Sequence, residues 1–154
     1  MELCEILIKT HIGNPKAHAI YGDFLYKDGQ NLEAKTQYKK VIAIDKNRPQ
    51  VWSQLLFIES EMEAYDDLET ESENAFQLFP ANPVYYFFNG IANSQLKNYK
   101  KAIISLEMGL EFIIENPALL VQFYSTMGDI YHTIKQHSKS DSLYELALFY
   151  EPDN

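Results

Sequence analysis

Apolar residues recur three and four positions apart along most of the chain, and this spacing predicts α-helices. The C-terminal segment shows the pattern well, because Leu143, Leu146, Ala147 and Tyr150 share one side of a predicted helix. No segment shows the strict alternation of apolar and polar residues that is typical of a half-buried strand. The pattern therefore predicts an all-α protein.

Prolines mark the starts of four predicted helix pairs at a constant interval. Pro15, Pro49, Pro83 and Pro117 each follow the last by 34 residues, which indicates an array of repeats. Proline is favourable at the first position of a helix, and an Asn before it can cap the helix through its side-chain oxygen. Asn precedes three of these prolines, and Arg48 precedes the other.

We expect about nine helices in a single array. Their approximate ranges are 2–11, 15–28, 31–45, 49–63, 66–79, 83–96, 99–115, 117–135 and 138–150. The first is the second helix of an incomplete repeat (1–13), and the others form four helix pairs (14–47, 48–81, 82–115 and 116–154). Because the chain begins in mid-repeat and ends where another repeat could start, we expect it to be a fragment of a longer protein.

Small residues recur twelve positions apart inside three of the pairs, where they allow close approach of the two helices. These pairs are Gly22 with Ala34, Gly90 with Ala102, and Gly128 with Ser140. Pro83 precedes Gly90 by seven residues, whereas Pro117 precedes Gly128 by eleven. The four additional residues predict that the first helix of the fourth pair is one turn longer than its counterparts and borders a binding surface.

The same positions carry a resemblance to the tetratricopeptide repeat family. That family places an aromatic residue or Leu, then Gly, Tyr, Ala, an aromatic residue, Ala and Pro at fixed offsets in a 34-residue helix pair. The matching residues in the four pairs are Tyr21, Gly22, Ala34 and Tyr38; Trp52, Leu55, Tyr65, Ala75 and Pro80; Tyr86, Gly90, Tyr99 and Ala102; and Tyr124, Gly128, Tyr131, Tyr144, Ala147 and Pro152. The sequence departs from the family pattern at Lys46, Glu59 and Asn89.

The resemblance implies a right-handed α-α superhelix that binds a protein or peptide in a concave groove lined by the first helix of each pair. In the family register the groove positions hold Ile20, Tyr26, Phe57, Phe87, Phe88 and Ile91. Aromatic side chains are frequent anchors at interfaces, so these residues are the predicted ligand contacts. The alternative is that they seal the seam between adjacent repeats. Polar residues near the groove, such as Gln54, Gln95 and Asp129, are expected to orient the ligand.

Family members that grip the C-terminal carboxylate of chaperones use cations on successive first helices. The corresponding positions here are Ala19, Asp23, Gln54, Val84 and Phe88, and the frame shifted by one repeat offers no cation either. That activity is therefore not expected.

Acidic residues are concentrated in the middle of the chain. Eight carboxylates lie between Glu59 and Glu73, and no Lys or Arg occurs between Arg48 and Lys97. The run is either a solvated convex face or a docking patch for a basic partner. The candidate patch consists of Glu59, Glu61, Glu63, Asp66 and Asp67.

Composition narrows the function classes further. The net charge of −9 argues against nucleic acid or an anionic membrane as the main partner. The single cysteine, Cys4, excludes an internal disulfide and a multi-cysteine metal site. The sequence has no phosphate-binding glycine loop, no zinc-protease pattern and no recognisable nucleophile, so we expect no catalytic activity, cofactor or metal. It shows no signal peptide and no apolar run long enough to span a bilayer.

The predicted function is that of a non-catalytic interaction scaffold that binds another protein or a peptide. The alternative is a structural spacer, or a segment that self-associates into a homodimer through its terminal helices. The frequent use of Lys, Asn and Tyr is typical of AT-rich bacterial genomes, and the compartment stays undetermined.

Overall fold

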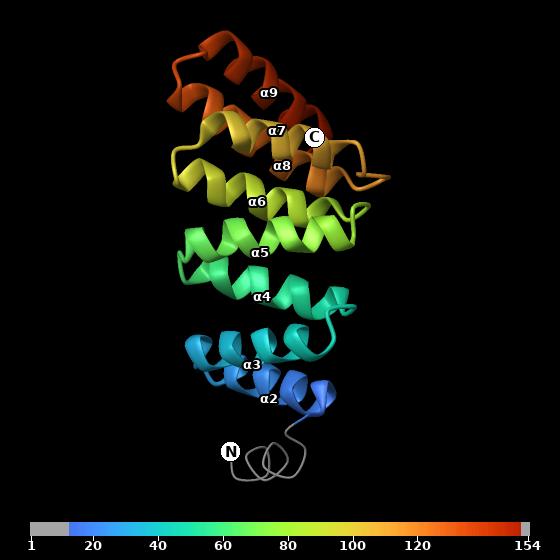
Figure 1. Cartoon of the computed structure of the whole chain (residues 1–154). Coiled ribbons are helices and arrows are strands. Elements are labelled where there is room, and N and C mark those ends of the chain that lie inside the picture. The colour runs from blue at the N-terminus through green and yellow to red at the C-terminus, as the bar shows by residue number, and fades with distance from the viewer. Residues whose placement is uncertain (1–12, 152–154) are drawn as a thin grey trace. The chain divides into compact units, whose positions relative to one another are not determined.

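The computed structural model describes residues 13–151, and this part of the chain forms eight α-helices and no strand (Figure 1). The helices are α2 (Pro15–Lys27), α3 (Asn31–Ile44), α4 (Pro49–Glu61), α5 (Tyr65–Leu78), α6 (Pro83–Gln95), α7 (Tyr99–Leu110), α8 (Pro117–Thr133) and α9 (His137–Tyr150). The all-α prediction is confirmed, and the helix count is close to the expected nine. The predicted leading helix, which includes Cys4, lies outside the described residues.

The chain divides into two compact units, Met1–Ala64 and Tyr65–Asn154. In the first unit α2 packs on α3, and α3 packs on α4. In the second unit α5 packs on α6, α6 on α7, α7 on α8 and α8 on α9, and α6 also touches α8. The boundary between the units falls inside the second predicted repeat, so the single array over 1–154 stays a prediction.

Asparagine caps begin three of the helices, as the sequence predicts. The side-chain oxygen in each case accepts a hydrogen bond from a backbone N–H of the first turn, and a proline takes the first helical position. The three bonds are Lys16 N to Asn14 Oδ1 (2.9 Å), Val84 N to Asn82 Oδ1 (3.1 Å) and Leu119 N to Asn116 Oδ1 (3.0 Å). Arg48 makes no such cap at the start of α4.

The turn inside each helix pair uses one backbone conformation. One residue per turn has a positive φ of 54° to 77°, and these residues are Gly29, Glu63, Lys97 and Lys135. The N–H of the next residue returns to a carbonyl in the last helical turn, as in the 2.9 Å bond from Gln30 N to Leu25 O. This arrangement is the Schellman ending of a helix. Only the first of the four turns places glycine at the left-handed position.

The first helix of the fourth pair has the additional turn that the sequence predicts. Helix α8 contains 17 residues, whereas α2, α4 and α6 contain 13 each. Leu119, in the first turn of α8, packs against a buried cluster formed by Ala102, Leu106, Phe123, Met127 and Ile130. The additional turn therefore contributes to the core of the second unit.

The predicted end of α7 is wrong. The expected helix continued to residue 115, but α7 ends at Leu110 and the chain turns at Glu111 and Phe112. The ring of Phe112 stacks on Tyr86 with 5.6 Å between centroids, and Ile113 packs against the buried cluster. Phe112 and Ile113 make these tertiary contacts from outside the helix, so they do not continue α7.

Candidate functional site

A pocket of about 230 Å³ lies in the first unit between α2 and α4, with α3 behind it. Asp23, Tyr26 and Lys27 of α2 line one side, and Gln54, Phe57 and Ile58 of α4 line the other. Tyr38 of α3 completes the lining. The pocket thus combines a carboxylate, an amide, an ammonium group and aromatic rings in a small volume.

Asp23 links α2, α3 and α4, the described helices of the first unit. Its Oδ1 accepts a 2.6 Å hydrogen bond from the Tyr38 hydroxyl and a 2.8 Å bond from Gln54 Nε2. Gly22 makes this arrangement possible, because a Cβ at residue 22 would lie 2.7 Å from Cε1 of Tyr38. The absence of a side chain lets the tyrosine ring lie directly on α2, and its hydroxyl then reaches the neighbouring carboxylate.

Two tyrosines at the pocket are held in their neutral, hydrogen-donating form. Burial, and then the hydrogen bond to the Asp23 carboxylate, raise the pKa of Tyr38 far above its usual range. Burial and the nearby Glu61 carboxylate also raise the pKa of Tyr26. Both hydroxyls therefore stay protonated to a higher pH than an ordinary tyrosine does.

Two of the predicted groove residues form the aromatic wall of the pocket. The rings of Tyr26 and Phe57 meet edge to face, with 6.2 Å between centroids and an interplanar angle of 85°. Phe57 is 47% exposed, which is high for a phenylalanine in a packed helix pair. Ile20 is 55% exposed on α2 but does not line this pocket.

The three predicted groove residues of the second unit are all half-buried. Phe87 packs against the core cluster, and its ring lies 5.2 Å from that of Phe123. Phe88 meets Phe87 edge to face at 6.3 Å. Phe87 thus fits the alternative that the predicted groove residues pack between adjacent repeats, here between α6 and α8. Ligand contact by Phe88 and Ile91 stays a prediction.

Glu59 does not belong to an exposed acidic patch, contrary to the sequence-based expectation. Its side chain is 0% exposed, and its Oε1 lies 3.3 Å from Lys35 Nζ and 3.6 Å from Lys39 Nζ. The lysines come from α3 and Glu59 from α4, so the group is an ion cluster between neighbouring helices. Glu61 and Glu63 are exposed in the first unit, as are Asp66 and Asp67 in the second.

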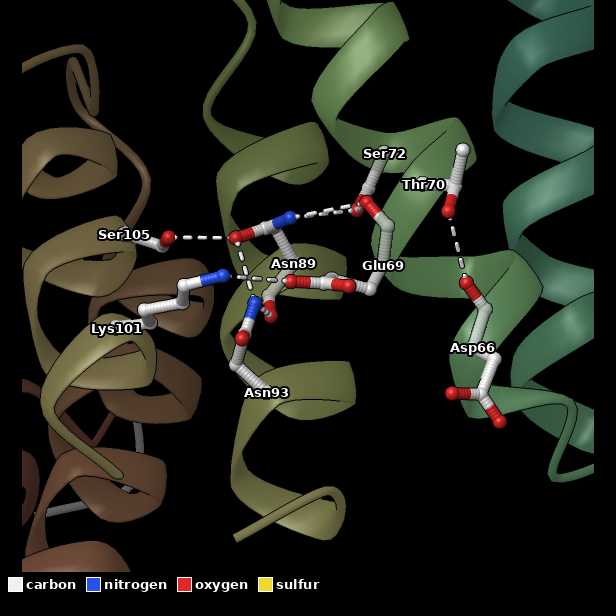
Figure 2. Close-up of polar contacts among 8 residues, drawn as sticks. All are labelled: Asp66, Glu69, Thr70, Ser72, Asn89, Asn93, Lys101 and Ser105. Atoms are coloured by element: carbon white, nitrogen blue, oxygen red, sulfur yellow. Dashed lines mark hydrogen bonds and ion pairs between the residues drawn. The ribbon is translucent and has the colours of Figure 1, made fainter. Parts of the chain in front are cut away.

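A buried polar network occupies the second unit at another departure from the family pattern. Figure 2 shows Asn89 of α6 between Ser72 of α5 and Ser105 of α7. Asn89 Nδ2 donates to Ser72 Oγ at 3.0 Å, and Ser105 Oγ donates to Asn89 Oδ1 at 2.6 Å. Asn93 Nδ2 donates to the same oxygen at 3.1 Å. The network lies in the core and joins three helices, so we assign it to packing.

Asp23 and Tyr38 were not predicted as members of a site, although the sequence contains a signal for them. A Gly-Asp pair followed by Tyr sixteen residues after the Gly occurs twice, at Gly22 and at Gly128. The second copy has the same geometry, because Tyr144 donates a 2.6 Å bond to Asp129 and a Cβ at Gly128 would lie 2.6 Å from Cε1 of Tyr144. Because the same three residues recur at the same spacing, the sequence could have indicated that the aspartate and the tyrosine are hydrogen-bonded to each other.

Metal and membrane sites receive no support from residues 13–151. Within that range no three His, Cys, Asp or Glu side chains are placed so that they could hold a metal ion. None of the helices α2 to α9 has both the length and the apolar character needed to cross a bilayer.

Comparison with solved structures shows which fold these helices form. A MamA crystal structure superposes with a TM-score of 0.85 over 97% of this chain and 85% of that one, at 15% identity. MamA from Desulfovibrio magneticus RS-1, from residue 41 to its end, gives 0.84 over 99% and 86% at 15% identity. PilF of Pseudomonas aeruginosa gives 0.75 over 96% and 65% at 18% identity.

No protein-family model matches the sequence, and a comparison with curated proteins finds no match. The structural likenesses confirm the predicted tetratricopeptide-like, all-α fold.

Proposed function

We propose that the chain is a non-catalytic interaction module that binds a segment of another protein through the first helices of its repeats. The observation that carries this proposal is the pocket between α2 and α4, in which Phe57 leaves about half of its surface to solvent beside Tyr26. Exposed aromatic rings next to fixed polar groups are typical of interface anchors. The likeness to MamA and PilF, at 15% and 18% identity, supports the fold in this proposal and leaves the partner open.

Phe57 and Tyr26 are the main anchors in this proposal, with Ile20 exposed on the same helix as Tyr26. Gln54 and Asp23 orient the bound segment. Phe88 and Ile91 of α6 are secondary candidates in the second unit. Glu61, Glu63, Asp66 and Asp67 remain candidates for contacts with a basic partner, and Glu59 is left out because it is buried.

Selection of binders from a displayed library of random peptides tests this function without knowledge of the natural partner. A synthetic peptide selected on the wild-type protein should bind Phe57→Ala at least tenfold more weakly in fluorescence anisotropy. Leu32→Ala is the matched control, because Leu32 is another exposed apolar residue of the same unit but lies on α3. Equal binding by all three proteins would place the ligand elsewhere.

A second candidate function is self-association through the last helix. Phe149 is 76% exposed on α9, and the exposed Leu146 lies three residues earlier on the same side of the helix. Large exposed apolar residues that lie together mark association surfaces. Light scattering over a dilution series should show dimers that Phe149→Ser abolishes. A monomer at every concentration would remove this candidate.

A further inference from the structure

The pocket between α2 and α4 has the chemistry of a site for one basic side chain. Building on the function proposed above, we infer that this pocket takes an arginine side chain from a basic segment of the partner protein. The guanidinium group binds the carboxylate of Asp23, and the apolar stem of the arginine lies along Tyr26 and Phe57.

Asp23 is oriented as an acceptor for a ligand. Its Oδ1 already accepts hydrogen bonds from Tyr38 and Gln54, at 2.6 Å and 2.8 Å. Within residues 13–151, no donor forms a hydrogen bond with Oδ2, and no Lys or Arg nitrogen lies within 4.0 Å of this carboxylate. Two donors from two other helices therefore hold the carboxylate in place while its second oxygen keeps its lone pairs for a cation.

The aromatic wall suits the rest of an arginine side chain. Long basic side chains bury their methylene stems along apolar surface and keep the charged head at a polar site. A guanidinium plane also stacks on aromatic faces, which favours arginine over lysine beside Tyr26 and Phe57. The two rings meet edge to face at 85°, and both residues line the pocket.

The size of the pocket suits one side chain of a partner protein. Its volume of about 230 Å³ is below the range of roughly 300 to 1,000 Å³ that is typical of small-molecule sites. A single extended side chain of a bound protein suits this volume, whereas drug-sized ligands usually occupy larger pockets.

The charges around the pocket favour a cation, with one opposing group. The Asp23 carboxylate lines the pocket. The Glu61 carboxylate lies close enough to Tyr26 to raise the pKa of the Tyr26 hydroxyl. Lys27 also lines the pocket and opposes a cationic ligand. The net charge of the whole chain is −9, which attracts basic segments at longer range. Removal of the Lys27 charge should therefore strengthen binding.

The test uses the wild-type protein, Asp23→Asn and Lys27→Met. Asparagine keeps an oxygen that can accept from Tyr38 and Gln54, so the variant preserves the local geometry and removes the charge. The probe is a synthetic peptide from the random library selected on the wild-type protein, made in two forms: one with its shared arginine and one with citrulline, its uncharged analogue. Fluorescence anisotropy measures the six dissociation constants.

We expect the selected peptides to share one arginine. Its replacement by citrulline should weaken binding to the wild type about tenfold and binding to Asp23→Asn less than twofold. Lys27→Met should bind the arginine peptide two- to threefold more tightly. If citrulline weakens peptide binding by the same factor in the wild type and in Asp23→Asn, the inference is overturned.

The outcomes separate this inference from the proposed function. Selected peptides without a shared basic residue, whose binding is still lost in Phe57→Ala, leave the interaction module standing and overturn the arginine site. Failure to select any peptide overturns both. Melting curves followed by circular dichroism verify that each variant is folded.

Discussion

The ring of Tyr38 lies on Gly22 so closely that a Cβ at residue 22 would come within 2.7 Å of Cε1. Gly22→Ala should therefore lower the free energy of unfolding by up to about 2 kcal/mol, because overpacking costs roughly 1 to 3 kcal/mol and the better helix propensity of alanine returns about 1 kcal/mol. Urea unfolding measures this change. The control is Gly13→Ala, since a Cβ at residue 13 would meet nothing within 4 Å. Unfolding midpoints that shift equally in both variants would contradict the packing argument.

Tyr38 should also give the protein a specific sensitivity to alkaline pH. Burial and the bond to Asp23 raise the pKa of Tyr38 in the folded state above its ordinary value near 10. A raised folded-state pKa contributes stability that is complete below pH 10 and is lost as the pH rises beyond that value. Tyr38→Phe lacks this contribution, so the difference in stability between wild type and variant should shrink as the pH rises above about 10. Parallel pH profiles of the two proteins would exclude this role.

The left-handed turn residues provide a stabilising substitution. Lys97 has a φ of 63° in the turn between α6 and α7, a conformation that costs a non-glycine residue roughly 1 to 2 kcal/mol. Lys97→Gly removes this strain and loses part of the gain to the greater freedom of glycine in the unfolded chain, so stability should rise by about 0.5 to 1 kcal/mol. Chemical denaturation compares it with Lys100→Gly, which should lose up to about 1 kcal/mol because Lys100 has helical backbone as the second residue of α7. A loss of stability in Lys97→Gly would show that its side chain matters more than its backbone.

The parts of the fold that sequence predicted correctly depend on local chemistry. An Asn-Pro pair determines where α2, α6 and α8 begin, and a count of residues between Pro117 and Gly128 predicts the additional turn of α8. The end of α7 could not be predicted in this way. It depends on Phe112 and Ile113 leaving the helix to pack on Tyr86 and the buried cluster, and such contacts are made with residues far away in the sequence.

The residues of the candidate site also fall into two groups, those predictable from local sequence and those that depend on contacts between helices. The repeat register was enough to propose Phe57 and Tyr26, because a position in a repeat predicts which side of a helix a residue occupies. The hydrogen bonds of Asp23 require three helices to meet, and only the structure brings them together. Glu59 was placed on the surface because acidic residues surround it in sequence. Its burial depends on Lys35, which lies 24 positions earlier on the neighbouring helix.

Asn89 should be more important to stability than its small side chain suggests. It is 4% exposed and occupies a position that the family usually gives to leucine. Asn89→Leu takes the hydrogen-bond acceptor away from the buried Ser105 hydroxyl, and a buried polar group without a partner costs about 1 to 3 kcal/mol. We expect a loss of this size in chemical denaturation, despite the larger apolar side chain.

The double variant Asn89→Leu/Ser105→Ala tests the cause of that loss. Removal of both partners of a hydrogen bond costs less than removal of one, so the double variant should be more stable than Asn89→Leu alone. Asn74→Leu is the control, since Asn74 is exposed on α5 and its bond to Glu71 is long at 3.4 Å. The stability of Asn74→Leu should change by less than about 0.5 kcal/mol. If Ser105→Ala gives no recovery, the cost of Asn89→Leu comes from the shape of leucine in the core and not from the unpaired hydroxyl.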